Sequence, residues 1–339
     1  MKATITDVAE RANVSIKTVS RVLNNEPNVA AATRERVKSV CKDLRYSPNL
    51  AARGLASSKT YFLALMYYNA SPNYLTNIQQ GAIEACRENG YHLVVEPFDL
   101  MGPDMAVDME MLLDRMPVDG VILTPPLVDD PVILDILRRF DKNYVLVAPS
   151  NPPADALSVK MDDTQAAYEM TQYLLRNGYK DIGFVKGHPQ HGASDMRYTG
   201  FSKALEEAGM AMRPEWIKTG DFTFPSGVAA AEEIFASPEH PRAIFASNDD
   251  MAAGVVSVAK RRSIAIPQKL AVCGFDDTVL AVTISPRLTT IKQPIHEMGY
   301  RAAKLLIDKS RANAHANDKN EGGNVFNLSH ELIVRESSE

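Results

Sequence analysis

Beyond residue 60, the apolar and polar positions alternate between two patterns that indicate the class of fold. Short apolar runs rich in β-branched residues predict buried strands at 62–68, 91–98, 120–126, 144–149, 156–162, 181–187, 243–248 and 270–276. Amphipathic patterns between them predict helices, for example at 76–89, 104–115, 163–177, 197–209, 227–236 and 250–261. This alternation is typical of α/β folds with doubly wound parallel sheets. Eight strands suit two Rossmann-like halves better than one sheet.

The first fifty residues contain helical patterns only. We predict a first helix capped at Thr6 and running through Arg11, a second that follows an N-cap at Ser15, and a third from about Ala32 to Leu44. A tight turn separates the first two. Two short helices joined in this way, with a third packed across them, have the geometry of a helix-turn-helix domain.

The second predicted helix has two different faces on a helical wheel. One face is apolar and belongs to the core; the other carries Ile16, Lys17, Ser20, Arg21 and Asn24. In helix-turn-helix domains the start of this helix enters the major groove, where Arg21 suits a guanine edge and Lys17 suits a base or a phosphate. The predicted phosphate contacts are Ser15, Thr18, Asn24, Thr33 and Tyr46. The alternative is a small all-α domain whose polar face meets only water.

Charge is divided unevenly along the chain. The net charge is −5, yet residues 1–60 hold eleven Lys and Arg against five Asp and Glu, a net charge of +6. The remaining residues therefore hold 26 basic and 37 acidic side chains, a net charge of −11. A basic head on an acidic body indicates that the head binds a polyanion such as DNA.

Residues 46–59, YSPNLAARGLASSK, contain a helical pattern that is too short to be stable alone. Pro48 separates this segment from the preceding helix, and Asn49 suits an N-cap. Leu55 has no apolar stripe to join. We therefore predict a hinge segment at 49–60 that becomes helical only when DNA and a partner contact it.

The strings TDVAERANVSIKTVSRVLN, TRERVK and LRYSPNLAARGL closely resemble the N-terminal signature of the LacI/GalR repressor family, and the likeness extends from Ile5 to about Arg335. The resemblance implies base reading by Ile16, Lys17 and Arg21, and we add Ser20, which lies on the same exposed face of the second helix. It also implies a hinge helix in the minor groove, with Leu55 inserted at the central base step. The hinge residues assigned in this way are Asn49, Ala52, Arg53 and Leu55.

The resemblance further implies a body like that of periplasmic sugar-binding proteins, with a ligand cleft between two lobes joined by three crossovers. We place the crossovers near 149–162, 288–294 and 322–326. The predicted domains are a headpiece at 1–48, the hinge at 49–60, an N-terminal subdomain at 61–161 plus 291–322, and a C-terminal subdomain at 162–290 plus 323–339. Residues 309–324 are predicted to be a polar loop.

Ligand groups are expected just beyond the carboxyl ends of the strands. The predicted effector residues are Tyr74, Asp162, Arg197, Phe222, Asn248 and Asp276; of these, Arg197, Asn248 and Asp276 lie in the family-like strings RYTGF, SNDDM and GFDD. Converging arginine, amide and carboxylate groups suit the hydroxyls of an uncharged sugar. For each residue, the alternative is a helix cap or a structural hydrogen bond. Two histidines in 188–196, where purine-sensing family members have arginine and threonine, count against a purine.

Catalytic and metal motifs are missing from the sequence. No GxGxxG follows the first strand, the string GHPQHG lacks the P-loop lysine, and no GxSxG occurs. The aspartate pairs 162/163, 249/250 and 276/277 lie on separate elements, and the three cysteines form no CxxC motif. We therefore predict no enzyme activity, no catalytic residue, no metal and no cofactor.

The predicted function is that of a sequence-specific DNA-binding transcriptional regulator, a repressor, whose affinity for DNA is controlled by a small ligand. The expected partners are a pseudo-palindromic double-stranded operator, a sugar effector and a second copy of the chain. The resemblance places the homodimer contacts near 76–88, 250–259 and Leu280. A stand-alone sugar-binding or transport protein is the alternative. The basic head and the absence of an apolar leader argue against it and favour a cytoplasmic protein without membrane contact.

Overall fold

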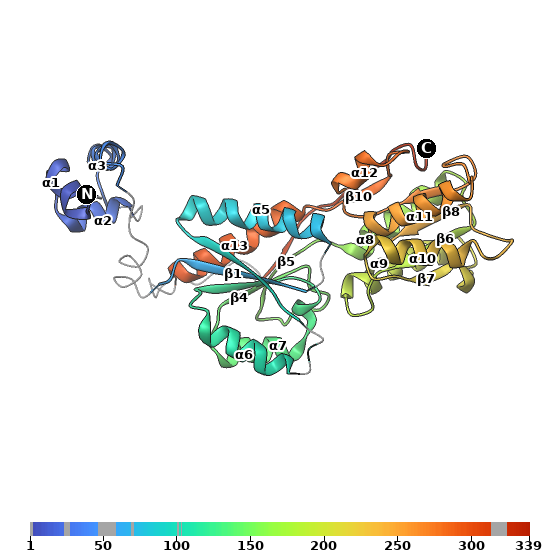
Figure 1. The fold of residues 1–339 in the computed structure, drawn as a ribbon, viewed down its shortest axis with the longest axis horizontal. Helices are drawn as coiled ribbons and strands as arrows, with labels where there is room; N and C mark the ends of the chain where they lie inside the picture. The colour runs from blue at the N-terminus through green and yellow to red at the C-terminus, as the bar shows by residue number, and fades with distance from the viewer. Residues whose placement is uncertain are drawn as a thin grey trace. The chain divides into compact units, whose positions relative to one another are not determined.

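The computed structural model describes residues 3–23, 28–46, 59–68, 71–99, 102, 104–312 and 324–339. The chain divides into two compact units, residues 1–61 and 62–339 (Figure 1). Among the described residues, no helix combines the length and the apolarity that crossing a membrane requires.

The N-terminal unit is a three-helix headpiece. Its helices are α1 (Ile5–Ala12), α2 (Ile16–Leu23) and α3 (Ala31–Asp43), and each packs against the other two. The core is formed by the apolar face of each helix, and its most deeply buried members are Val8, Ala12, Val19, Val22 and Val37. The predicted helix-turn-helix arrangement is therefore confirmed, with boundaries within one residue for α3.

The first helix begins earlier than predicted. Thr4, not Thr6, is the N-cap of α1, because Thr4 and Asp7 form a reciprocal capping box: the Thr4 backbone N–H donates to Asp7 Oδ2 at 2.7 Å, and the Asp7 backbone N–H donates to Thr4 Oγ1 at 3.4 Å. Ser15 acts at the start of α2 as predicted, since the Thr18 backbone N–H donates to its hydroxyl at 3.1 Å.

The larger unit contains two α/β lobes. In the N-terminal lobe a six-stranded parallel sheet has the order β11-β5-β4-β3-β1-β2. Its strands are β1 (Phe62–Tyr67), β2 (His92–Pro97), β3 (Gly120–Leu123), β4 (Tyr144–Val147), β5 (Leu157–Lys160) and β11 (Val325–Asn327). The residues of β3 are completely buried, as the apolar run at 120–126 predicted.

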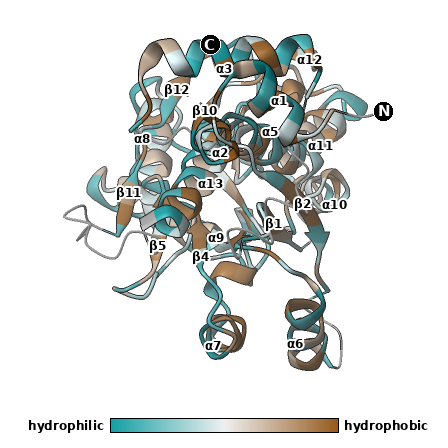
Figure 2. Cartoon of the chain, turned by 90° about the vertical axis from the view of Figure 1, so that its left-hand side faces the viewer, coloured by the Kyte–Doolittle hydropathy of each residue, from teal (hydrophilic) through white to brown (hydrophobic). Residues whose placement is uncertain are grey.

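Helices cover both faces of this sheet. On one face lie α5 (Pro72–Asn89) and α13 (Ile295–Ala312), which pack against each other, and on the other lie α6 (Met105–Arg115) and α7 (Pro131–Arg139) (Figure 1). A short 3₁₀ turn, η1 (Leu127–Asp129), precedes α7. Both α6 and α7 carry apolar as well as polar residues, as expected of amphipathic helices that bury one face (Figure 2).

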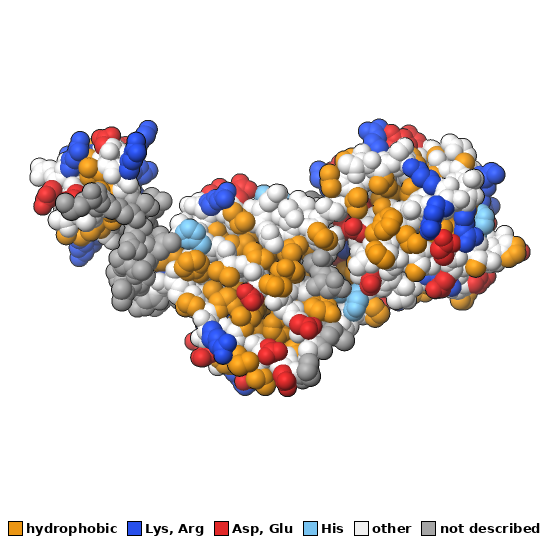
Figure 3. Space-filling model, in the orientation of Figure 1, with side chains coloured by type: hydrophobic (Ala, Val, Ile, Leu, Met, Phe, Trp, Pro, Cys, Tyr) orange, Lys and Arg blue, Asp and Glu red, His pale blue; other side chains and the backbone are white. Residues whose placement is uncertain are grey.

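The C-terminal lobe has a four-stranded parallel sheet in the order β7-β6-β8-β9. Its strands are β6 (Ile182–Lys186), β7 (Ile217–Thr219), β8 (Ala243–Ala246) and β9 (Ala271–Cys273). Helix α8 (Asp163–Arg176) packs against α9 (Gly192–Glu207), and α10 (Phe224–Ile234) packs against α11 (Asp249–Arg261). The 3₁₀ turn η2 (Pro214–Trp216) and the short helix α12 (Val279–Thr283) complete the lobe. On its surface, basic and acidic side chains lie side by side (Figure 3).

Three crossovers connect the lobes, and the last one lies later than predicted. Strand β10 (Thr290–Lys292) pairs antiparallel with β12 (Glu331–Ile333) in the connecting region. Because Val325–Asn327 pairs with β5, it belongs to the N-terminal sheet, so the assignment of 323–339 to the C-terminal subdomain is wrong for these residues. The predicted loop at 309–324 also begins too early, since α13 continues through Ala312.

Candidate functional site

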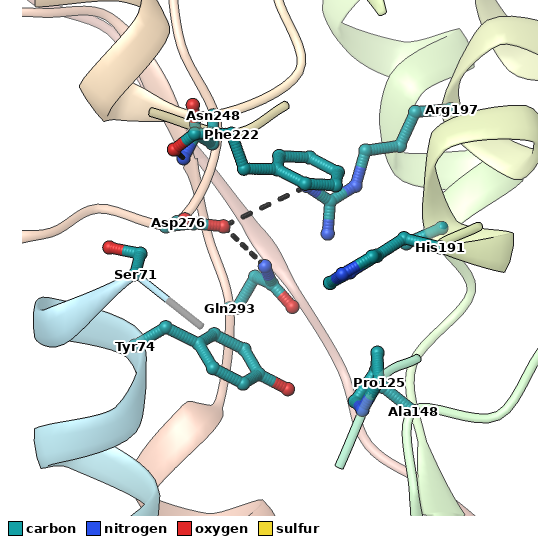
Figure 4. A pocket seen from close by; sticks show the side chains of 11 residues that line it. Ser71, Tyr74, Pro125, Ala148, His191, Arg197, Phe222, Asn248, Asp276 and Gln293 are labelled. Carbon is teal, nitrogen blue, oxygen red and sulfur yellow. Dashed lines mark hydrogen bonds and ion pairs between the residues drawn. The ribbon is translucent and has the colours of Figure 1, made fainter. Parts of the chain in front are cut away.

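A pocket lies between the two lobes and is lined by residues from both (Figure 4). Its empty volume, counted with its mouth toward solvent, is about 540 Å³. The lining residues are Ser71, Tyr74, Pro125, Ala148, His191, Ala193, Arg197, Phe222, Asn248, Asp276 and Gln293. Five of the six predicted effector residues are therefore brought together.

Arg197, in the second turn of α9, is held rigidly in this pocket. Its Nε donates to Asp163 Oδ1 at 2.8 Å, and its Nη1 donates to the Ser247 carbonyl oxygen at 2.5 Å. The guanidinium also lies over the Phe275 ring, 3.7 Å from the ring centroid. Because α9 starts at Gly192 and not at the predicted residue 197, the helix itself places this side chain.

Asp276, the first aspartate of the GFDD string, lies beside Arg197. Gln293 donates a hydrogen bond from Nε2 to Asp276 Oδ1, and Arg197 Nη1 is 3.9 Å from the same oxygen (Figure 4). Burial raises the pKa of Asp276 well above its usual range, although the Arg197 charge opposes this shift. The carboxyl group is thus disposed toward its neutral form and presents a hydrogen-bonding rather than a strongly charged surface.

Asn248 has the capping role that was the alternative to ligand binding. Its Oδ1 accepts a hydrogen bond from the Met251 backbone N–H at 2.9 Å and caps α11, and its Nδ2 donates to the Phe222 carbonyl oxygen at 2.8 Å. A primary amide has two N–H groups, so one remains for a ligand. Asn248 therefore lines the pocket while fixing the loop that carries Phe222.

Asp162 is the predicted effector residue that does not reach the pocket. Its side chain caps α8 by accepting a hydrogen bond from the Gln165 backbone N–H at 2.8 Å, and it is exposed. The neighbouring Asp163 is buried and contacts Arg197 instead. Adjacent residues at a helix start point in different directions, and the position of the strand end alone could not decide between them.

Aromatic rings form the walls of the pocket. His191 and Phe222 pack with their ring centroids 5.1 Å apart, and Tyr74 faces them from the other lobe (Figure 4). Burial, together with His188 and Arg197, lowers the pKa of His191 to about 3, so its ring is neutral at physiological pH. Burial likewise raises the pKa of Tyr74, which keeps its phenol protonated. Neutral rings with polar edges suit a ligand that combines apolar faces with hydroxyl groups.

Unusual backbone conformations gather at the same place. Ala148, Phe222 and Asp276 line the pocket with positive φ angles of 52°, 70° and 117°, and Asp277 follows with 56°. Residues other than glycine adopt such angles at a cost of about 1–3 kcal/mol each, and they cluster at functional sites. The clustering of these backbone conformations around one cavity therefore supports a binding role for the cavity. This indication does not depend on the chemistry of the lining side chains.

A buried carboxyl group supports the pocket from behind. Asp249 accepts hydrogen bonds from the Thr290 hydroxyl at 2.7 Å and from the Thr278 backbone N–H at 2.7 Å. Its Oδ2 also accepts from the Thr278 hydroxyl at 3.1 Å. Burial raises its pKa to about 7 despite these donors. Asp249 thereby ties the start of α11 to the crossover strand β10 and to the loop that follows Asp276.

Sequence reasoning missed several residues that line the pocket. Ser71, Pro125, Ala148, His191, Ala193 and Gln293 were not predicted individually. Ser71 lies within the stretch after the first strand, and Gln293 lies within a predicted crossover, so position was the available signal for both. The described residues contain no cluster of three His, Cys, Asp or Glu suited to a metal ion.

The predicted DNA-binding residues of the headpiece differ in their exposure to solvent. Ile16 is 47% exposed and Lys17 is exposed, whereas Ser20, Arg21, Thr33 and Tyr46 are half-buried. The hydroxyls of Ser15 and Thr18 hydrogen-bond each other at 2.9 Å at the start of α2. Contact of these residues with DNA stays a prediction. Asn24 and the hinge residues Asn49, Ala52, Arg53 and Leu55 lie outside the described residues.

Comparison with known proteins extends over the whole chain. Residues 4–49 match the model for bacterial regulatory proteins of the lacI family, and residues 171–338 match that for a periplasmic binding protein-like domain. The chain is 33% identical to catabolite control protein A of Priestia megaterium, with 100% of both proteins covered. It is 32% identical to the HTH-type transcriptional repressor PurR of Photobacterium profundum, with 99% of this chain and 98% of that protein covered.

Solved structures agree with this likeness. A complex of the transcriptional regulator CelR with cellobiose aligns with a TM-score of 0.74 at 30% identity, covering 99% of this chain and 100% of that one. The lac repressor dimer bound to operator and the anti-inducer ONPF shares the fold, with a TM-score of 0.77 at 24% identity over 100% and 99% of the two chains. The relatives named here are regulators and not enzymes. The chain therefore belongs to the LacI family of bacterial regulatory proteins.

Proposed function

We propose that this protein is a homodimeric transcriptional repressor that binds a pseudo-palindromic operator and responds to a small uncharged sugar held between its lobes. The observation that carries this proposal is the pocket itself. It is lined from both lobes and contains a fixed arginine, a carboxyl group and an amide on one side and aromatic rings around them. It occurs in a chain that also has a helix-turn-helix headpiece.

The chemistry of the pocket favours a neutral polyhydroxyl ligand. Arg197 and Asn248 offer N–H donors, Asp276 and Gln293 offer oxygen acceptors, and Tyr74 offers a hydroxyl that does both. A sugar needs such alternating donors and acceptors for its hydroxyls, together with flat apolar surfaces for its C–H faces. The relative bound to cellobiose adds support for this ligand class.

Dimer formation is proposed from the surface of the C-terminal lobe and from the logic of DNA reading. Val279 is 60% exposed and Val282 is 49% exposed on α12, on either side of the Leu280 that was predicted at the dimer contact. One helix-turn-helix domain reads few base pairs, so two copies at half-sites one helical turn apart give useful specificity. A ligand that prefers one arrangement of the lobes shifts the population of DNA-binding dimers.

The experiment is to select an operator from random double-stranded DNA with the full chain and to measure its affinity by fluorescence anisotropy. We expect the selected site to bind at least about a thousandfold more tightly than a scrambled site, with affinity that falls steeply as salt rises. Adding cellobiose or another sugar found by a thermal-shift screen should change that affinity. Equal affinity for selected and scrambled DNA would exclude the repressor and favour the stand-alone sugar-binding protein.

A further inference from the structure

We propose that Asp163 sets the charge of the ligand: by neutralising Arg197, it confines the pocket to uncharged ligands and excludes anions such as phosphates and carboxylates. This inference rests on the proposed function, since it concerns the ligand of the same pocket. It assigns a task to a residue that does not itself line the cavity. Asp163 is therefore a positioning residue, acting through the guanidinium that does line it.

The contact between the two side chains is close and well shielded from water. Arg197 Nε lies 2.8 Å from Asp163 Oδ1, and the side chains are only 6% and 2% exposed, respectively. Such a pair is weakly screened, so the carboxylate cancels most of the field that the guanidinium would otherwise project. Asp163 is also the first residue of α8, where the N-terminal end of the helix stabilises a negative charge.

The guanidinium remains available to a ligand even though its charge is compensated. Nε and Nη1 are occupied by Asp163 and the Ser247 carbonyl oxygen, and one terminal nitrogen points toward the space between Phe222, His191 and Gln293 (Figure 4). Arg197 thus acts as an oriented hydrogen-bond donor to a hydroxyl. A donor of this kind does not require a negatively charged partner.

The other groups around the cavity add no positive charge that could hold an anion. Arg197 is the one Lys or Arg among the eleven described residues that line the pocket. His191 is neutral because burial lowers its pKa to about 3. Three further carboxyl groups, Asp249, Asp250 and Asp276, lie at or just behind the lining. Desolvating an anion here would therefore be costly and uncompensated.

Replacing Asp163 by asparagine should reverse this preference. The substitution keeps the shape and one acceptor for Arg197 Nε but removes the negative charge. Asp276 Oδ1 remains 3.9 Å from Arg197 Nη1, but burial disposes this carboxyl group toward its neutral form, so a small anion that enters the pocket would restore the lost pairing. The variant should therefore acquire affinity for a small anion that the unaltered protein does not bind.

The test measures the thermal midpoint of the full-length protein in increasing inorganic phosphate, against sodium chloride at equal ionic strength. We expect Asp163→Asn to be stabilised by phosphate with an apparent Kd at least about tenfold lower than that of the unaltered chain. Should the variant fold poorly, its refolding yield in phosphate against chloride reports the same binding. The double variant Asp163→Asn with Arg197→Met should lose the response, because the cation is gone.

Asp162→Asn is the matched control, since it removes the same charge one residue away but at an exposed helix cap. It leaves the pocket and the headpiece unchanged, so any phosphate bound by the DNA-binding face cancels in the comparison. The proposal is overturned if Asp163→Asn gains no phosphate response over this control, or if the unaltered protein responds equally. No DNA is used, so a failure of the operator experiment and a failure here are distinct.

Discussion

The two lobes face the ligand pocket with different chemistry. The N-terminal lobe contributes Ser71, Tyr74, Pro125 and Ala148, which are uncharged. The C-terminal lobe contributes Arg197 and Asp276, with the carboxyl groups of Asp163 and Asp249 fixed behind them. The charged groups at the pocket are thus concentrated on one lobe, whereas the other lobe lines it with uncharged residues.

The two sides of the pocket also differ in how their side chains are held. On the C-terminal side, side chains are held by hydrogen bonds within the same lobe, so they are in position before any ligand arrives. Contacts across the cleft are of another kind: the Ser71 hydroxyl donates to Asp250 Oδ2 at 2.9 Å, and Gly192 closely approaches Ser150. Changes on the C-terminal side should therefore affect stability and binding, and changes on the N-terminal side should mainly affect closure.

The largest effect is expected for Arg197→Met. The substitution leaves Asp163 buried without its cation and removes the contact with the Phe275 ring. Breaking one side of a buried ion pair costs roughly 3 kcal/mol or more, so the free energy of unfolding should fall by about this amount. Ligand response should be lost while the headpiece, a separate unit, keeps its affinity for DNA.

Urea unfolding, calorimetric titration with the screened sugar and anisotropy on the selected operator measure these three properties. Arg213→Met is a suitable control, because its ion pair with Glu239 is exposed to solvent and should contribute little to stability. If Arg197→Met were as stable as this control, the hydrogen bonds of Arg197 would not hold the pocket side chains of the C-terminal lobe in position before a ligand binds.

The next effect concerns Gly192, the first residue of α9. A Cβ atom at this position would lie 2.2 Å from Ser150 Cβ and 2.6 Å from Ser150 Oγ, in the opposite lobe. Gly192→Ala should therefore push the lobes apart and lower the free energy of unfolding by about 1–3 kcal/mol, although alanine is the better helix former. The change in melting temperature and the sugar affinity should both report it.

A second substitution tests whether the collision is the cause. Ser150→Gly removes the two atoms nearest to the new Cβ, and the next nearest, Asp129 Oδ2, lies 3.0 Å away. The double variant should regain most of the lost stability and sugar affinity. An increase in stability in Gly192→Ala alone would mean that the lobes are not held at this distance.

Much of the fold followed from the sequence because its physical signals are local. The apolar runs at 62–68 and 243–248 are continuous since both faces of a central parallel strand are buried, and they became β1 and β8. The short edge strand Val325–Asn327 has only one partly buried residue, Phe326, and lies among polar residues. Its place in the N-terminal sheet is decided by pairing with β5, which no local pattern reports.

The position of the pocket could also be predicted from the sequence, but not every residue that contributes to it. Strand ends indicated where ligand groups gather, and Arg197, Asn248 and Asp276 were found in this way. The choice between Asp162 and Asp163 required the direction of each side chain at a helix start, and the partner of Asp163 lies 34 residues further along the chain. Long-range contacts of this kind depend on the packing of α8 against α9.

A smaller effect is expected from the titration of His191. Its pKa in the folded protein is lowered to about 3 by burial, and an unfolded histidine titrates near 6.5, so below this pH the unfolded state binds the extra proton. Stability should therefore fall as the pH decreases from 7 to 5.5, by about 1 kcal/mol from this residue. Urea unfolding at both pH values should show a smaller difference for His191→Asn. An unchanged pH dependence in this variant would show that the ring is accessible to protons.

The smallest effect on stability and binding should come from a substitution on the N-terminal side of the pocket. Ser71 is the N-cap residue of α5, yet its hydroxyl makes no cap bond and donates to Asp250 of the other lobe at 2.9 Å. Ser71→Ala removes this hydrogen bond, so the free energy of unfolding should fall by about 0.5–1.5 kcal/mol and sugar affinity should weaken by less than about tenfold. Burial raises the pKa of Asp250, and the hydrogen bond from the Ser71 hydroxyl partly offsets this shift. Because the variant lacks that hydrogen bond, the pKa of Asp250 should rise further. Ser71→Thr keeps the hydroxyl and serves as the control. If Ser71→Ala lost as much sugar affinity as Arg197→Met, the proposed difference between the two lobes would be wrong. A hydrogen bond that closes the lobes would then matter as much for binding as the polar groups of the C-terminal lobe.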